Sequence, residues 1–130
     1  MIKKTIKYTD YNNQEREEEF YFNLNKAELT EMEFSQSGGL TNLIERVVKE
    51  QNSKELIKIF KDLVLRAYGV KSDDGRRFIK NAEVRDSFAQ TEAYSELFME
   101  LATNADAAAD FVNGITPQIS KVQNNLHPIK

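Results

Sequence analysis

Few residues of this chain have the types and spacing that catalysis requires. The only histidine, His127, lies in a terminal segment that we expect to be flexible, where a general base would be hard to position. The neighbouring carboxylates Glu17, Glu18 and Glu19 fall on a predicted strand, where successive side chains point to opposite faces. A solvated strand face explains these acids better than a paired acid and base. We therefore predict no catalytic residue and no enzyme activity.

The stretch YGVKSDDGRRFIKN, residues 68–81, raises the question of a metal or phosphate loop. It lacks the spaced acids and terminal glutamate of an EF-hand loop, and two arginines follow its glycine. A second stretch, SQSGGLTN at residues 35–42, precedes a predicted helix but has neither the Walker pattern nor its lysine. The chain has no cysteine, which removes thiolate ligands and nucleophiles. We expect no metal, no cofactor and a structural connector at residues 68–81.

Composition places the chain among ordinary globular proteins. Hydrophobic residues make up 40% and charged residues 30% of its 130 residues, which argues against disorder. The net charge is −3, whereas a general nucleic-acid binder carries a clear basic excess. No apolar run approaches the roughly 20 residues of a membrane span. These features, with the absence of cysteine, favour a cytosolic protein that forms one globular domain over residues 1–116.

Residues 1–24 alternate in the manner of an antiparallel β-hairpin. A three-residue loop at 12–14 would pair Ile6 with Phe20 and would set Lys7 opposite Glu19. We prefer this register to a two-residue loop, which would set the apolar face of each strand against the polar face of the other. One face of the hairpin would then need a helix to cover it. The apolar residues of this face are Ile2, Ile6, Tyr8, Phe20, Phe22 and Leu24.

The remainder, residues 26–114, reads as five to six helices, so the predicted fold class is mainly α (α+β), a hairpin followed by a compact helical bundle. The helix that begins at Ser53 has the widest apolar stripe, and we expect it to be central and to end at Gly69. An earlier helix should stop near Gly38–Gly39, and the last should close at Gly114 before a flexible tail, 117–130. A helical stripe is expected at Leu40, Leu43, Ile44, Val47 and Val48. Residues suited to N-caps are Asn25 (with Glu28 completing a capping box), Ser53, Asn81, Thr91 and Asn104.

Charge is distributed unevenly along the chain. Basic residues gather between 66 and 80, whereas residues 86–115 contain acids but no lysine or arginine. Such regions can pair within the fold or between copies of the protein. We therefore select as candidate protein-interaction residues Arg76, Arg77, Phe78, Lys80, Glu96, Glu100, Asp106 and Asp110.

Three stretches resemble the tail assembly chaperones of long-tailed, siphovirus-type bacteriophages of Gram-positive hosts. The first, EREEEFYFNLNKAELTEME, runs from the hairpin into a helix. The second, LVLRAYGVKSDDGRRFIKN, places the Lys-Ser-x-Asp-Gly-Arg turn and a Phe-x-Lys after a helix. The third is FAQTEAYSELFMELATNADAAADFVNGI. With the linking helices they cover roughly residues 1–116, and the order and spacing of the second and third match as well as the residue types.

The resemblance implies a protein that binds the tape-measure protein, keeps it soluble and assists tail-tube polymerisation around it. It also implies action in the host cytoplasm, absence from the mature virion and a longer form made by frameshifting. Self-association is expected from the charge pattern, and the family has no catalytic motif to transfer. The alternative function is a small phage or bacterial regulator that binds nucleic acid, through Arg76, Arg77 and Lys80, or another protein.

Overall fold

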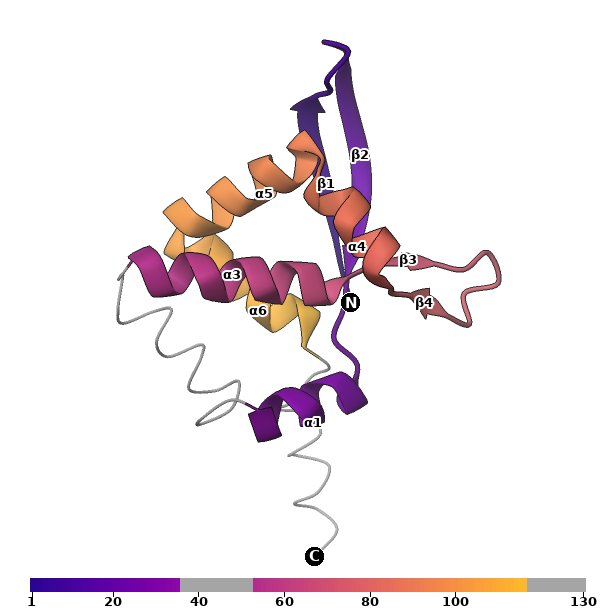
Figure 1. Cartoon of the computed structure of the whole chain (residues 1–130), viewed down its shortest axis with the longest axis vertical. Coiled ribbons are helices and arrows are strands. Elements are labelled where there is room, and N and C mark those ends of the chain that lie inside the picture. The colour runs from indigo at the N-terminus through magenta and orange to yellow at the C-terminus, as the bar shows by residue number, and fades with distance from the viewer. Residues whose placement is uncertain (36–52, 117–130) are drawn as a thin grey trace, which may run out of the picture.

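The fold is α+β, with an N-terminal antiparallel hairpin followed by helices and a second, short hairpin (Figure 1). A computed structural model describes residues 1–35 and 53–116. The predicted helix stop near Gly38–Gly39, the stripe within residues 40–48 and the expected flexible tail lie outside them. The described elements are β1 (Ile2–Thr9), β2 (Glu15–Phe22), α1 (Lys26–Ser35), α3 (Ser53–Ala67), β3 (Tyr68–Lys71), β4 (Phe78–Ile79), α4 (Ala82–Ala89), α5 (Glu92–Thr103) and α6 (Ala105–Ile115).

The predicted hairpin is confirmed, but its register is shifted by two residues. Ile6 lies opposite Glu18 instead of Phe20, and Lys7 lies opposite Glu17 instead of Glu19. The cause is Asp10, whose carboxylate accepts hydrogen bonds from the backbone N–H groups of residues 12 and 14 at 2.8 and 3.0 Å. This contact makes residues 11–13 the loop. A shift of two keeps every side chain on its predicted face, because the side-chain period of a strand is two.

The polar face of this hairpin carries cross-strand ion pairs, as its sequence predicts. The ammonium of Lys3 lies 3.1 Å from the carboxylate of Glu19, and that of Lys7 lies 3.4 Å from Glu17. All four side chains remain half or more exposed. These pairs add little to the stability of the fold, because exposed ion pairs contribute only about 0–1 kcal/mol each.

The central helix does not end at Gly69 as predicted. It ends at Ala67, and the next residues form a strand that pairs with β2 through Tyr21↔Gly69 and Phe22↔Tyr68. Strand β3 then pairs with β4, which completes a four-stranded sheet in the order β1-β2-β3-β4. The connector at 68–81 is therefore itself a β-hairpin, and it continues the sheet that the N-terminal hairpin begins.

Gly69 is required by close packing in this sheet. A Cβ atom at this position would lie 2.6 Å from Cε2 and 2.8 Å from Cδ2 of the Phe78 ring. We expect Gly69→Ala to destabilise the protein by about 1–3 kcal/mol, because the ring must move. This loss exceeds the gain of up to about 1 kcal/mol from a stiffer unfolded chain.

Urea unfolding of Gly69→Ala measures this effect. Adding Phe78→Ala should remove most of the penalty, because the truncated side chain leaves room for the new methyl group. An equal penalty for Gly69→Ala with and without Phe78→Ala would show that the ring is not the cause.

The helix caps agree with the predictions from sequence. Asn25 and Glu28 form a reciprocal capping box at the start of α1, with bonds of 2.8 and 2.9 Å. Helix α3 begins at Ser53, but the predicted N-cap contact of this residue lies outside the described side chains. Helix α6 continues through Gly114 to Ile115, one residue beyond the expected end. Three other predicted caps accept a backbone N–H bond from the residue three positions ahead. The pairs are Asn81 with Val84 at 2.8 Å, Thr91 with Tyr94 at 3.2 Å and Asn104 with Ala107 at 3.0 Å.

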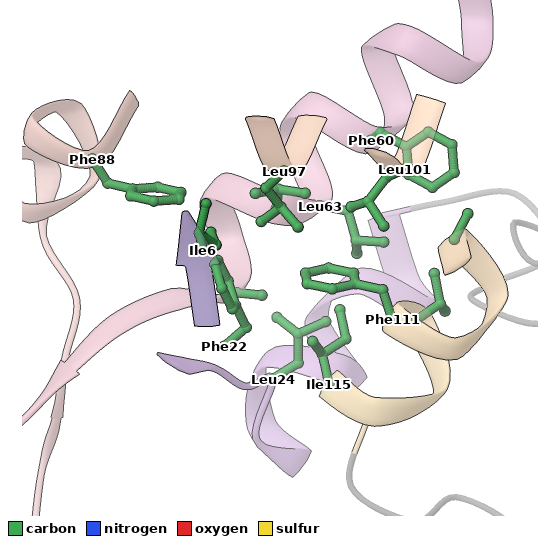
Figure 2. Packing of buried hydrophobic residues seen from close by; sticks show 14 of the residues in the cluster. Ile6, Phe22, Leu24, Phe60, Leu63, Phe88, Leu97, Leu101, Phe111 and Ile115 are labelled. Carbon is green, nitrogen blue, oxygen red and sulfur yellow. The ribbon is translucent and has the colours of Figure 1, made fainter. Parts of the chain in front are cut away.

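The core lies between the apolar face of the N-terminal hairpin and the helices (Figure 2). Helix α5 packs against β1, α3 and α6. Phe22 is fully buried and its ring contacts those of Tyr68, Phe88 and Phe111. Helix α3 buries most of its predicted stripe, but Ile57 is 46% exposed. The buried residues are Ile6, Phe22, Leu24, Met32, Phe60, Leu63, Val64, Ala67, Phe88, Ala93, Leu97, Leu101, Ala108, Phe111, Val112 and Ile115.

Candidate interaction surface

The loop between β3 and β4, residues 72–77, carries two of the candidate arginines, and we call it the arginine tip. Its backbone is closed by a bond of 2.9 Å from the N–H of Ser72 to the carbonyl of Arg77 and by one of 2.9 Å from Gly75 to Ser72. Gly75 has a φ of 73°, in the left-handed region that glycine adopts without strain. The Asp-Gly turn predicted from sequence is therefore present, as the end of a hairpin.

Asp74 stiffens the arginine tip from within. Its carboxylate accepts bonds from the hydroxyl of Ser72 at 2.7 Å and from the backbone N–H of Arg76 at 3.0 Å. These bonds, that from Ser72 first, lower the pKa of Asp74 below its usual value. The hydroxyl of Ser72 in turn accepts the backbone N–H of Arg77 at 3.0 Å. The tip is held in one shape although it is exposed to solvent.

The two arginines of the tip are exposed, and neither guanidinium forms an ion pair with any residue in the described ranges. The hairpin that carries them extends away from the helices (Figure 1). Phe78, the third candidate, is half-buried against Gly69. The structure thus presents Arg76 and Arg77 to solvent and turns the neighbouring aromatic ring toward the sheet.

Lys80, the third basic candidate, has a role inside the fold. Its ammonium donates to both carboxylate oxygens of Glu28, at 2.9 and 2.8 Å, and to the carbonyl of Asn23 at 2.6 Å. All three protons of the ammonium group therefore have acceptors. This contact joins the end of β2, the first turn of α1 and the residue before the cap of α4.

The four acidic candidates are placed on α5 and α6. Glu100 pairs with Lys4 at 3.2 Å and so ties α5 to β1. Glu96, Asp106 and Asp110 are exposed, and no ion pair in the described residues involves them. No ion pair joins these four acids to the four basic-side candidates within residues 1–35 and 53–116, so the fold does not pair the two sets internally.

Sequence reasoning missed a concave surface beside β2. An open groove of about 800 Å³ lies where β2 and β3 separate beyond their two paired residues. The sequence predicts only a solvated strand face for the glutamate run of β2, and it does not predict β3, which forms the other wall of the groove. The lining residues are Thr5, Glu17, Glu18, Glu19, Phe20, Tyr21, Tyr68, Gly69, Val70 and Lys71.

The titratable groups of the N-terminal hairpin have structural partners and no catalytic arrangement. The hydroxyl of Tyr8 donates to Glu18, and this bond together with burial raises the pKa of Tyr8 to about 12. Arg16 lies 2.6 Å from Asp10 and 3.3 Å from Glu18, and its hydrogen bond lowers the pKa of Asp10. A pKa this high keeps the Tyr8 hydroxyl protonated at pH 7, so that it acts as a hydrogen-bond donor to Glu18.

Two further properties concern the described part of the chain. Residues 1–35 and 53–116 contain no group of three or more histidine, cysteine, aspartate or glutamate side chains that could hold a metal ion. None of the helices formed by these residues is long and apolar enough to cross a membrane. The surface features that remain are the arginine tip, the exposed acids and the groove beside β2.

Comparison with known proteins connects these features to a family. No curated protein and no solved structure matches the chain significantly. A family model described as phage tail assembly chaperone matches residues 1–127, which is nearly the whole chain. The chain therefore belongs to the phage tail assembly chaperone family.

Proposed function

We propose that this protein binds the tape-measure protein, keeps it soluble and assists polymerisation of the tail tube around it. The observation that carries the proposal is the family match over residues 1–127. Members of an assembly chaperone family act on tail proteins in the host cell. The tape measure is the tail protein that most needs cover, because a long helical client exposes apolar surface that aggregates.

The surface of the protein suits many weak contacts better than one deep site. The large apolar side chains that are exposed in the described residues come from different elements, and they are Met1, Tyr11, Ile57, Val70 and Met99. The apolar faces of α5 and α6 are buried in the core and do not add to this exposed apolar surface. Weak contacts suffice when many copies bind one long client, because the sites act together. Exposed acids on α5 and α6 would keep such an assembly soluble.

The proposal includes further features of tail assembly chaperones of siphovirus-type phages of Gram-positive hosts. The protein acts together with the tail-tube protein and with a longer, frameshifted form of itself. The two forms diverge after Pro117, and both are absent from the mature virion. Mass spectrometry of purified particles tests the last point, and peptides of this chain at structural copy number would contradict it.

The decisive experiment is co-expression with a tape-measure protein from the same phage. We expect the soluble fraction of the tape measure to rise severalfold when the chain is present, because its apolar helical surface is covered. An unrelated folded domain of similar size, expressed at the same level, is the control for unspecific effects. If the tape measure stays insoluble while this chain is soluble and abundant, the proposed client is wrong.

A nucleic-acid-binding function has no comparable support. The basic cluster that suggested it loses Lys80, which is paired with Glu28 inside the fold. Arg76 and Arg77 remain exposed, as does Lys71, but the groove that Lys71 lines contains three glutamates. A general nucleic-acid binder carries a clear basic excess, whereas the net charge of this chain is −3.

A further inference from the structure

We propose that the groove beside β2 receives the arginine tip of a second copy of this chain. The partner is thus identical to the protein itself, and the contact is between copies instead of with a client. The inference goes beyond the proposed function and does not depend on which tail protein is bound. Three observations support it: an unpaired strand edge, the charge of the groove and the arginines of the tip, which have no ion pair within residues 1–35 and 53–116.

The edge of β2 that faces the groove is open along most of its length. The backbone N–H of Asn23 donates to the carbonyl of Ala67, on the β3 side of β2. Alternate residues of a strand direct their N–H and C=O groups to the same side, so Glu19 and Glu17 direct theirs to this side as well. The ladder with β3 includes only Tyr21 and Phe22. Among the described residues, no strand therefore lies beside the backbone groups of Glu17 and Glu19.

The opposite wall of the groove is also an unpaired edge. Continuing the register of Tyr21↔Gly69 would set Lys71 opposite Glu19, but the ladder stops before that pair. Lys71 instead places its ammonium 4.3 Å from the centre of the Tyr21 ring. Unpaired strand edges pair with additional polypeptide unless they are covered, so the groove between β2 and β3 is suited to bind a chain segment.

The charge of the groove selects a basic segment. Its lining contains three glutamates and one lysine. Glu17 and Glu19 pair with Lys7 and Lys3, but their side chains stay 56% and 52% exposed. Carboxylates that are this accessible can accept further hydrogen bonds. A guanidinium is the matching donor, because its planar fork binds carboxylates with two parallel bonds.

The arginine tip supplies such donors in a fixed shape. Arg76 and Arg77 are exposed and without ion pairs in the described residues, and the bonds of Asp74 and Ser72 hold the loop. A loop that is already ordered loses little entropy on binding. β3 forms one wall of the groove. The β3–β4 hairpin extends away from β2 (Figure 1), so the tip of a copy points away from the strand that forms the other wall of its own groove.

Each copy has one groove and one tip, so two copies can exchange tips in a closed dimer or continue as an open array. Both arrangements place a tip of one copy beside β2 of the next. The contact is electrostatic and should weaken as salt screens the exposed charges.

Cross-linking between two populations tests the contact, and the absence of native cysteine makes it clean. One population carries Arg76→Cys and the other Glu19→Cys, and a short bismaleimide joins them. A disulfide is unsuitable because it spans only about 4.4–6.8 Å between Cα atoms, less than an arginine–glutamate pair. We expect the mixed dimer to form at least about tenfold faster than in the control mixture of Arg76→Cys with Asp110→Cys. Equal rates in the two mixtures would overturn the proposal.

Charge reversal gives an independent test by light scattering. The double variants Arg76→Glu/Arg77→Glu and Glu17→Arg/Glu19→Arg should each lose self-association, and mixing them should restore it. Asp106→Arg/Asp110→Arg is the matched control and should associate like the parent. The milder Glu17→Gln/Glu19→Gln serves if a reversed hairpin does not fold, and circular dichroism checks each variant. The proposal would be wrong if the parent protein is monomeric at every concentration, or if the charge reversals have no effect. Either outcome is independent of the co-expression experiment with the tape-measure protein.

Discussion

Phe22→Ala is expected to destabilise the protein by about 3–5 kcal/mol, the range measured for removal of buried phenylalanine rings. The ring is completely buried and lies 5.3 Å from that of Phe111 and 5.7 Å from those of Tyr68 and Phe88, centre to centre. It thus joins β2 to β3, α4 and α6 (Figure 2). The loss would be a large part of the roughly 5–15 kcal/mol that stabilises a typical domain.

Urea unfolding followed by circular dichroism measures this loss. Phe78→Ala is the matched control, because the same atoms are removed from a half-buried ring, and its loss should be clearly smaller. Phe22→Leu provides a measurable value if the alanine variant does not fold, since it keeps most of the apolar volume. Equal losses for the alanine variants of Phe22 and Phe78 would mean that the core is not centred on Phe22.

Features encoded by a few neighbouring residues could be predicted from the sequence. The capping box of Asn25 and Glu28 and the caps at Asn81, Thr91 and Asn104 are all present as expected. A cap requires only a side-chain oxygen within reach of N–H groups two or three residues ahead. Tertiary packing has little influence on such a contact, so a local pattern is enough.

The strand register depended on a side chain that hydrophobic alternation ignores. Shifting the pairing by two residues leaves the apolar pattern intact, so alternation alone cannot distinguish the two registers. Asp10 decides between them by accepting the N–H groups of Asn12 and Gln14. An aspartate that bonds two residues ahead is a known turn signal, and weighing it would have placed the loop correctly.

The β3–β4 hairpin was missed because its strands are too short to show a period. β4 has two residues, and β3 has four. Gly69 also looked like a helix end, whereas the ring of Phe78 is what requires a glycine there. This contact joins two strands, so the sequence around Gly69 alone does not predict it. The groove depends on the same missed hairpin, so it could not be anticipated either.

Lys80→Met is expected to destabilise the protein by about 1–3 kcal/mol, because it removes a charge-assisted contact from a partly shielded site. The side chain of Lys80 is 21% exposed and that of Glu28 is 31% exposed. Methionine keeps the apolar stem but removes the donor that Lys80 supplies to the Glu28 carboxylate and the Asn23 carbonyl. Arginine should restore only part of the loss. The N–H groups of a guanidinium lie in one plane, whereas the three protons of an ammonium point in different directions.

A double-mutant cycle with Glu28→Gln isolates the pair from the separate capping role of Glu28. We expect a coupling free energy of about 0.5–3 kcal/mol, since the two side chains are in direct contact. Lys71→Met is the control from the same hairpin, where loss of the contact with Tyr21 should cost only about 0.5–1 kcal/mol. Additive effects of Lys80→Met and Glu28→Gln would contradict the coupling.

Hydrogen exchange in α1 distinguishes local attachment of this helix by Lys80 from a general effect of Lys80 on stability. Lys80 holds the first turn of α1, and the neighbouring Leu24 N–H donates to the carbonyl of Ile115 at 2.8 Å. Loss of the contact between Lys80 and Glu28 should unfold α1 first, because the bond of Leu24 still holds the chain that precedes this helix. Amide hydrogen exchange in Lys80→Met should therefore accelerate in residues 26–35 before it does in α5. Uniform acceleration over both helices would show that Lys80 stabilises the whole fold and gives α1 no separate attachment.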